Sequence, residues 1–256
     1  MNVNTIEKHW YKILKRILTS GKYTTKDDAE ILEYLGYYDF IPNPLNDSAF
    51  DHYGFPTSNP EFLLDLIRKG IFEIDGYPMN AQAQADYVES LNKDESILCF
   101  EDEKSFVYTY PERLQAMRPR KDDTKHLIDQ TDVIIYRLIN NFGSNRAVAN
   151  VYNAFLDAYE TDIPCLQWVQ ATIRNNKLRL HVMFRSNDIG GAWPSNMLLL
   201  MYLGMFISYA INVETQKEIV FEGVDYHVSS AHIYKNQVLD MQTVVDNAGK
   251  KNKDKC

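Results

Sequence analysis

Cys165 and Arg185 are the two residues of this sequence most suited to covalent chemistry together. Two runs of alternating apolar and polar residues, 167–173 and 178–184, lie between them and are joined by the polar residues 174–177. This pattern predicts a β-hairpin, in which the cysteine and the arginine would be neighbours on adjacent strands. A guanidinium stabilises a nearby thiolate, which is the nucleophilic form of cysteine. We therefore expect a reactive thiol with a lowered pKa.

Three further motifs follow this cysteine in the second half of the chain. In order, the four motifs are Pro164-Cys165, Arg185-Ser186-Asn187-Asp188, Pro194-Ser195-Asn196 and His232-Ile233-Tyr234. This arrangement resembles the thymidylate synthases and the related phage-type pyrimidine nucleotide hydroxymethylases, which carry Pro-Cys, Arg-Ser-x-Asp, Pro-x-Asn and His-x-Tyr. The resemblance implies an α+β, thymidylate synthase-like fold: a single domain with a mixed β-sheet core covered by helices. It also implies a homodimer with the sheets packed back to back.

The resemblance assigns roles to these motifs. Cys165 would add to carbon 6 of a pyrimidine nucleotide, so that carbon 5 can attack the one-carbon unit of 5,10-methylenetetrahydrofolate, the co-substrate. Arg185 and Ser186 would bind the nucleotide phosphate, and the guanidinium would also lower the pKa of the thiol. His232 and Tyr234 lie two apart on an extended segment and would bind the 3′-hydroxyl of the sugar. No metal is expected.

The choice of base and the contact with the folate depend on two more residues. The carboxamide of Asn196 can accept a hydrogen bond from N3–H of uracil and donate one to its O4, whereas cytosine presents the opposite pattern. Relatives that act on deoxycytidylate carry aspartate at this position, so Asn196 favours dUMP. Asp188 corresponds to the family residue that contacts the pterin ring of the folate.

The phosphate site departs from the family pattern. The family has Ser-Arg-Arg before a strand, and both arginines reach the partner subunit's nucleotide; here Asn145 replaces the first arginine and Arg146 remains. The alternative for Arg146 is a surface arginine at the start of a strand. Residues 22–28 correspond to a flexible family loop with a phosphate-binding arginine, which this chain lacks. Lys22 or Lys26 could replace it, although a solvated lysine is the expected role of each.

Two more catalytic candidates lie in the first half of the chain. Glu61 lies near the start of a predicted helix, 58–70, where family members have a glutamate that organises proton transfers. The alternative is an acidic residue that stabilises the helix dipole, and Asp65 is a weaker candidate. Tyr108 matches a tyrosine over the family's active site, although Thr109 replaces the usual glycine; the alternative for Tyr108 is core packing.

Composition limits the class of protein. The 256 residues, 45% hydrophobic and 24% charged, suffice for one large domain with its own core. A net charge of −8 argues against a broad nucleic-acid-binding surface. The apolar run 197–211 is shorter than the ~20 residues that span a bilayer, which predicts a buried helix rather than a membrane anchor. Three cysteines without a disulfide or metal spacing indicate a reducing cytoplasm, or the host cytoplasm for a phage-encoded protein.

The remaining periodicities predict the elements that position these residues. Helices are expected over residues 4–21, from about 124 to 142, and over 197–210. Strands are expected over residues 147–152 and 218–228. Residues 39–59 indicate an irregular connection, and 80–104 a variable surface segment. We expect a catalytic domain over 1–248 and a disordered, lysine-rich tail over 249–256.

The product depends on whether water reaches the intermediate after carbon transfer. The short, lysine-rich segment after Tyr234 and the Arg-Ser-Asn-Asp motif resemble the phage deoxycytidylate hydroxymethylase, whereas Asn196 favours uracil. Together they predict a dUMP hydroxymethylase of the kind phages use to make modified DNA. The alternatives are a thymidylate synthase, which converts dUMP to dTMP, and a catalytically inactive relative that binds nucleotides.

Overall fold

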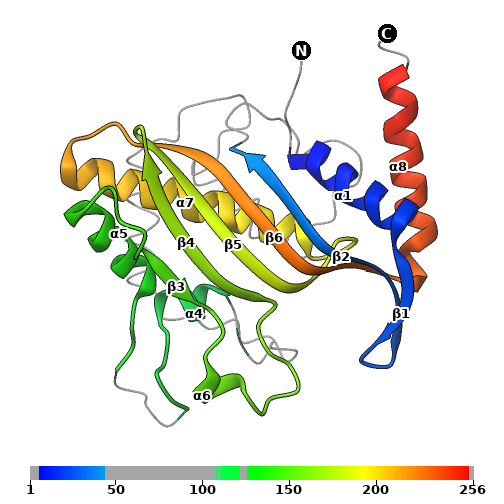
Figure 1. Cartoon of the computed structure of the whole chain (residues 1–256), viewed down its shortest axis with the longest axis horizontal. Helices are drawn as coiled ribbons and strands as arrows, with labels where there is room; N and C mark the ends of the chain where they lie inside the picture. Colours follow the sequence, from blue (N-terminus) through cyan, green and yellow to red (C-terminus); the bar gives the residue numbers. More distant parts are fainter. Residues whose placement is uncertain (1–5, 44–107, 109, 122–125, 254–256) are drawn as a thin grey trace, which may run out of the picture.

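A computed structural model describes residues 6–43, 108, 110–121 and 126–253. Its centre is one six-stranded sheet with the strand order β1-β2-β6-β5-β4-β3 (Figure 1). The strands are β1 Lys22–Lys26, β2 Ala29–Pro42, β3 Val148–Asn150, β4 Leu166–Arg174, β5 Lys177–Asp188 and β6 Val220–Tyr234. Neighbouring strands are antiparallel except β5 and β6, which are parallel. The predicted mixed sheet is therefore confirmed.

Helices lie on one face of this sheet and beyond its edges. They are α1 Ile6–Ser20, α4 Tyr110–Gln115, α5 Gln130–Asn140, α6 Ala154–Asp157, α7 Trp193–Thr215 and α8 Val238–Lys253, with a 3₁₀ turn η3 Lys235–Gln237 before α8. Helix α7 packs against β5 and β6, and α1 packs against β2. In Figure 1 α7 passes behind the sheet, and no described helix crosses the face towards the viewer. The apolar side chains of the helices and of the covered sheet face form one core.

The predicted hairpin is confirmed as β4 and β5, which pair from Leu166↔Phe184 to Arg174↔Lys177. Asn175 and Asn176 form its turn with φ of 52° and 59°. Positive φ at both turn residues is the geometry that matches the twist of a two-residue hairpin, and asparagine tolerates it better than most residues. The hairpin therefore brings the start of β4 beside the end of β5.

Strand β2 corrects two predictions. Residues 22–28 form β1 and its turn to β2 rather than an open loop, and residues 39–42 belong to β2 rather than to an irregular connection. Gly36 has a φ of +69°, and the pairing with β6 passes from Leu35↔Ser230 to Tyr37↔Val228 without it. The register with β6 is the same on both sides of Gly36. Buried and exposed residues do not alternate along the first half of β2, since Ile31 and Leu32 are both buried and Leu35 and Gly36 are both exposed.

Three other elements differ in extent from the predictions. Helix α5 begins at Gln130 behind the N-cap Asp129, because the Asp129 side chain accepts the amide hydrogen of Asp132; Leu127 and Ile128 are exposed outside it. Strand β6 is continuous through the His-x-Tyr motif. Helix α8 packs beside α1 and continues to Lys253, into the tail for which composition predicts disorder.

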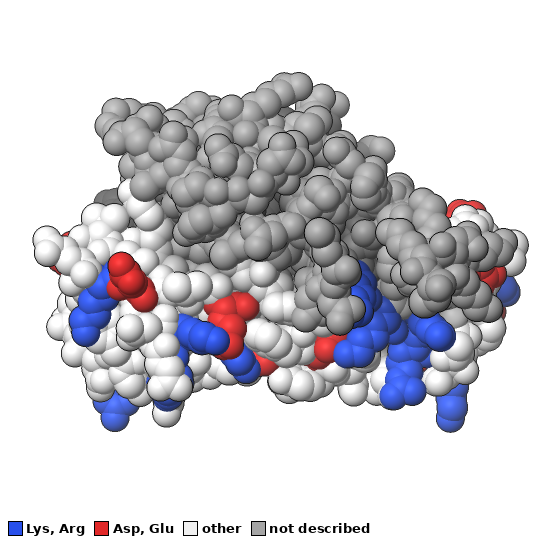
Figure 2. All heavy atoms as spheres, turned by 90° about the horizontal axis from the view of Figure 1, so that it is seen from above, with Lys and Arg blue, Asp and Glu red and all other residues white. Residues whose placement is uncertain are grey.

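Helix α7 is longer than predicted, with 23 residues. By length and composition it could span a bilayer, but 56% of its most apolar window is buried inside the protein, and the core helix of a globular protein passes the same test. Its Gly204 lies directly against Phe221 of β6, since a Cβ added to this glycine would lie 2.2 Å from the ring. Figure 2 shows acidic and basic side chains close together on the described part of one face of the molecule.

Candidate active site

The first contact of the site joins Cys165 to Arg185. The backbone N–H of Arg185 donates to the carbonyl oxygen of Cys165 at 2.8 Å, so the two residues are neighbours, as the hairpin predicts. The guanidinium turns towards the residues before the cysteine: Nε donates to the Pro164 oxygen at 3.1 Å and Nη2 to the Ile163 oxygen at 2.6 Å. Three of the five guanidinium hydrogens then remain for other acceptors.

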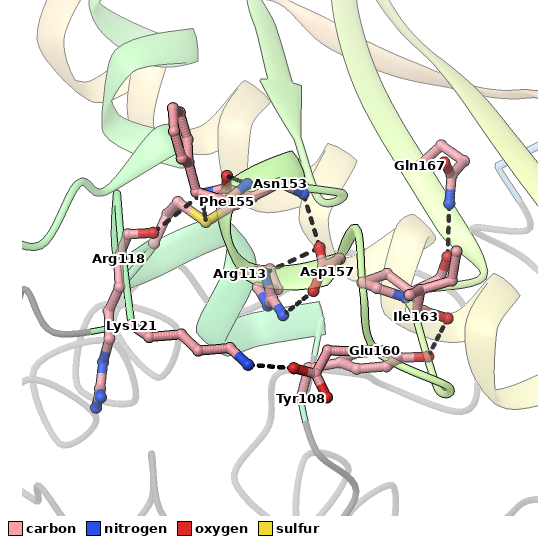
Figure 3. Close-up of polar contacts among 12 residues, drawn as sticks. Tyr108, Arg113, Arg118, Lys121, Asn153, Phe155, Asp157, Glu160, Ile163 and Gln167 are labelled. Carbon is pink, nitrogen blue, oxygen red and sulfur yellow. Dashed lines mark hydrogen bonds and ion pairs between the residues drawn. The ribbon is translucent and has the colours of Figure 1, made fainter.

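Two other side chains hold the same segment before the cysteine (Figure 3). The Tyr108 hydroxyl donates to the Ile163 oxygen at 3.1 Å, and Gln167 Nε2 donates to the Pro164 oxygen at 2.5 Å. Tyr108 therefore lies beside the nucleophile's loop, and burial together with the nearby Cys165 and Asp162 raises its pKa. Hydrogen bonds from Tyr108, Gln167 and Arg185 therefore hold the main chain directly before Cys165.

The Cys165 thiol has a raised pKa, which makes the prediction of a lowered value wrong for the protein without bound substrate. Burial is the largest cause, because a thiolate loses hydration when it leaves water. Arg185 and Lys26 lower the pKa, as expected of cations, and Asp162 raises it. The two cations therefore oppose the effect of burial without overcoming it.

Parallel pairing of β5 with β6 brings the second and fourth motifs together. Ser186 lies opposite Ser230 and Asp188 opposite His232, and the Ser186 hydroxyl lies 3.3 Å from His232 Nδ1. Lys26, at the end of β1, donates to the Ser186 hydroxyl at 3.3 Å and lies 3.3 Å from His232 Nε2. One hydroxyl, one imidazole and one ammonium group thus converge from three strands.

His232 is neutral at neutral pH in this arrangement. Burial, and then the positive charge of Lys26, lower its pKa from 6.5 to about 4. The ring of Tyr234 lies edge-on to the imidazole, with centroids 5.5 Å apart. Burial raises the pKa of Tyr234, and the carboxylate of Asp188 and the thiol of Cys165 also raise it.

The carboxylate of Asp188 organises the loop after β5. Its Oδ1 accepts the backbone N–H groups of Gly190 at 3.0 Å and Gly191 at 3.2 Å. A Cβ on Gly191 would lie 2.7 Å from Asp188 Oδ2, so the close approach requires glycine there. Burial raises the pKa of Asp188, although both backbone hydrogen bonds lower it. Both of these hydrogen bonds are accepted by Oδ1 and neither by Oδ2.

Asn196, in the first turn of α7, is the end of a chain of hydrogen bonds. Its Nδ2 donates to Asn187 Oδ1 at 3.1 Å, and Asn187 Nδ2 donates to the hydroxyl oxygen of Tyr226 at 3.0 Å. Asn187 follows Ser186 on β5, and Tyr226 lies on β6. Asn196 is therefore attached to the same two strands that carry the phosphate and sugar candidates.

Two predicted site residues lie apart from this group. Arg146 is exposed just before β3, and the register Val148↔Gln170 places it towards the far end of β4 from Cys165. The two residues therefore do not meet within one subunit. Glu61, like Asp65, falls outside the residues that the structure describes.

A buried ion pair between Arg113 and Asp157 stabilises the elements next to the site (Figure 3). Arg113 Nη2 lies 2.7 Å from Asp157 Oδ1, and their side chains are 7% and 2% exposed. The pair joins α4 to α6, and α4 begins at Tyr110, whose hydroxyl accepts the backbone N–H of Leu166 at 3.3 Å. Helix α4 is thereby held against Leu166, the first residue of β4, which directly follows Cys165.

Four of the residues in this group were not predicted as parts of the site from the sequence. The sequence favours a solvated role for Lys26 over phosphate binding, and it indicates no role in the site for Tyr110, Asn187 or Tyr226. Only the place of Asn187 inside the Arg-Ser-Asn-Asp motif could have drawn attention to it. Within the described residues, no three His, Cys, Asp or Glu side chains gather in a way that could hold a metal ion.

A sequence model of the thymidylate synthase family matches residues 100–253, which include all four motifs. The chain belongs to the thymidylate synthase family. Its α+β architecture is that of this family, and as a family member it is a one-carbon transferase.

Archaeal relatives resemble the chain over most of its length. The "Putative thymidylate synthase" of Methanothermobacter marburgensis is 28% identical over 249 residues, 96% of this chain and 98% of the relative. Proteins of the same name in Methanocaldococcus jannaschii and Methanopyrus kandleri are 31% identical over 218 residues and 26% identical over 238 residues. These alignments cover 80% and 93% of this chain, and 88% and 93% of the relatives.

Proposed function

We propose that this thymidylate synthase family member transfers a one-carbon unit from 5,10-methylenetetrahydrofolate to carbon 5 of dUMP. The observation that carries the proposal is that residues from the ends of β1, β4, β5 and β6 meet, namely Lys26, Cys165, Arg185, Ser186 and His232. The Cys165 sulfur adds to carbon 6 of the ring, which makes carbon 5 nucleophilic. The folate supplies the carbon unit that carbon 5 attacks.

The phosphate site is proposed to combine three donors of one subunit. Arg185 has guanidinium hydrogens left after holding the loop, Ser186 offers a hydroxyl, and Lys26 adds a positive charge beside it. Lys26 takes the place of the loop arginine that the sequence lacks. His232 is neutral and close to Tyr234, which suits hydrogen bonding to a sugar hydroxyl.

We also propose that the enzyme is a homodimer and that Arg146 completes the phosphate site of the partner subunit. The distance of Arg146 from Cys165 along β4 and the sheet face without a described helix support this arrangement. The proposed place of action is the cytoplasm, where thiols such as that of Cys165 stay reduced. No nucleic-acid or membrane partner is proposed.

The proposed product is thymidylate, because the relatives that match nearly the whole chain carry that name. This choice departs from the hydroxymethyl product expected from the sequence. Hydroxymethyl-dUMP is the second candidate. After Tyr234 the chain continues through η3 and α8 and packs beside α1 rather than over the site. Other segments would then have to exclude the water that gives a hydroxymethyl product. Tyr108 and the unplaced Glu61 are the proposed groups for proton movement, and Asp188 is the proposed contact of the pterin.

The test is incubation of the protein with dUMP and methylenetetrahydrofolate, followed by mass analysis of the nucleotide and assay of dihydrofolate. A methyl gain with dihydrofolate indicates thymidylate synthesis, and a hydroxymethyl gain without it indicates hydroxymethylation. Cys165→Ser should abolish either product, whereas the matched variant Cys256→Ser should not. Unchanged dUMP with retained nucleotide binding would contradict the proposal and indicate the inactive relative.

A further inference from the structure

A pocket of about 530 Å³ lies between α1 and β2. Strand β1 pairs with β2 only as far as Glu33, and the pocket begins at the next residue, Tyr34, where α1 lies along β2. None of the residues that line it belongs to the candidate active site. Pockets of about 300–1,000 Å³ are the size that binds small molecules. This pocket is therefore large enough for a ligand of its own.

Three basic side chains of α1 line this pocket. Lys15 and Arg16 follow Lys12 by three and four residues, so all three lie on one side of the helix. Like charges at this spacing repel each other and destabilise a helix. The chain as a whole has a net charge of −8, so its composition does not account for a positive cluster. An anion bound in the pocket would relieve the repulsion.

The nearby carboxylate of Asp39 offsets only part of this charge. Lys12 Nζ donates to Asp39 Oδ1 at 2.6 Å, so the charge of Lys12 has a partner. Among the residues that the structure describes, no carboxylate lies within ion-pair distance of Lys15 or Arg16. The pocket therefore offers an anion two positive charges that are not already paired.

The guanidinium of Arg16 is held in a position that suits an anion. It lies over the ring of Tyr34, 5.3 Å from the centroid. The N–H groups of a guanidinium lie in its own plane, so the contact with the ring leaves them available to two oxygens of one phosphate or carboxylate group. The ammonium group of Lys15 adds charge without a fixed geometry. The side chains thus match an anionic group with paired oxygens.

We propose that the pocket between α1 and β2 binds a small anion with two or more negative charges, recognised through phosphate or carboxylate oxygens. Arg16 binds one pair of oxygens, and Lys15 and Lys12 neutralise the remaining charge. This site is separate from the proposed phosphate site of the nucleotide at Lys26 and Ser186. The inference does not depend on whether the protein acts on dUMP.

Calorimetry of the whole protein with inorganic pyrophosphate and, separately, with citrate tests this inference. Lys15→Gln combined with Arg16→Gln should weaken binding by about tenfold or more, because charge-assisted hydrogen bonds are lost. The matched control combines Arg120→Gln with Lys217→Gln, which removes the same charge from two cations that lie over aromatic rings elsewhere. This control should bind as tightly as the wild type. Circular dichroism and thermal melting establish that both proteins are folded.

Repeating the titrations with saturating dUMP separates this pocket from the active site. Binding that persists with dUMP and weakens only in the α1 variant supports the inference, even in a protein that forms no thymidylate. Tighter binding of pyrophosphate than of citrate would indicate a phosphorylated ligand, and the reverse a polycarboxylate. Displacement of the anion by dUMP, equal weakening in both double variants, or no binding of either anion would overturn the inference.

Discussion

Opposing effects act on the sulfur of Cys165. Burial raises the pKa of the thiol, and the charges of Arg185 and Lys26 lower it. Since Arg185 also holds the carbonyl oxygens of Ile163 and Pro164, its substitution would disturb the loop as well as the charge. Lys26 contacts Ser186 and His232 rather than this loop, and it is therefore the better probe of the charge alone.

We expect Lys26→Met to raise the pKa of the Cys165 thiol further and to slow its alkylation by iodoacetamide at pH 8. The reason is that less thiolate is present when a neighbouring cation is removed. Peptide mapping by mass spectrometry follows Cys165 separately from the other cysteines. Lys22→Met, at the exposed start of β1, is the control and should leave the rate unchanged. Equal rates in all three proteins would contradict the influence of Lys26 on the thiol.

The lowered pKa of His232 predicts how stability depends on pH. Between pH 6.5 and about 4 the unfolded chain binds a proton at this histidine that the folded protein does not, so acid favours unfolding. The free energy of unfolding should fall over this range by up to about 3 kcal/mol from this group. His232→Gln should show a correspondingly shallower fall in urea titrations at a series of pH values. Parallel curves for the two proteins would show that the histidine titrates normally.

At the scale of the elements, the close packing of α7 against β6 limits the size of the side chain at position 204. At Gly204, alanine would favour the helix by about 1 kcal/mol, but its Cβ would lie 2.2 Å from the Phe221 ring. Overpacking of a core costs about 1–3 kcal/mol, so we expect Gly204→Ala to lower the free energy of unfolding. Combination with Phe221→Leu should recover part of the loss. The exposed Gly143→Ala is the control; a Gly204→Ala protein as stable as the wild type would contradict this packing.

Elements with a regular period could be predicted from the sequence, and interrupted ones could not. The β4–β5 hairpin alternates cleanly around a turn of two asparagines, and α7 is apolar throughout, so both were identified. Strand β2 could not be predicted because buried and exposed residues do not alternate along its first half: Ile31 and Leu32 are both buried, and Leu35 and Gly36 are both exposed. Helix α8 has an apolar stripe, Val238, Met241, Val244 and Val245, that packs against the core and is a signal for a helix. Only its last turns are rich in lysine, which is the composition that favours a disordered tail.

The site was predictable where one motif carried the chemistry and was not where partners came from distant strands. Cys165 and Arg185 are neighbours through a local hairpin. Tyr226 and Lys26 reach the site only through the pairing of β6 with β5 and β2, which short motifs do not encode. The prediction of a lowered pKa for Cys165 is wrong because burial raises the pKa, and how far a thiol is buried depends on the whole fold rather than on a local motif.

At the scale of the whole molecule, one face of the sheet carries no helix among the residues that the structure describes. Half-buried side chains on this face come from β4 and β5, such as Trp168, Gln170, His181 and Met183. A second copy packed on it would remove these side chains from water and carry Arg146 towards another active site. The proposed dimer thus links the open face to the incomplete phosphate site.

Mixing two inactive variants tests this exchange of residues. We expect Cys165→Ser and Arg146→Ala to lose most activity separately, and a mixture refolded together to regain part of it. The mixed dimer has one site with both wild-type residues, because the cysteine comes from one subunit and the arginine from the other. Sedimentation measures the dimer, and product formation measures the recovery. A mixture as inactive as its components would contradict a shared site.

Strand β6, near the C-terminus, lies between β2 from the beginning of the chain and β5 from its middle. During synthesis on the ribosome, the β1–β2 hairpin therefore cannot pair with β6 until residues 220–234 have been synthesised. Long waits of this kind slow folding and expose strand edges. A chain released before residue 220 would lack the strand that joins its two halves, and nascent copies of this protein should depend on chaperones until β6 has been synthesised.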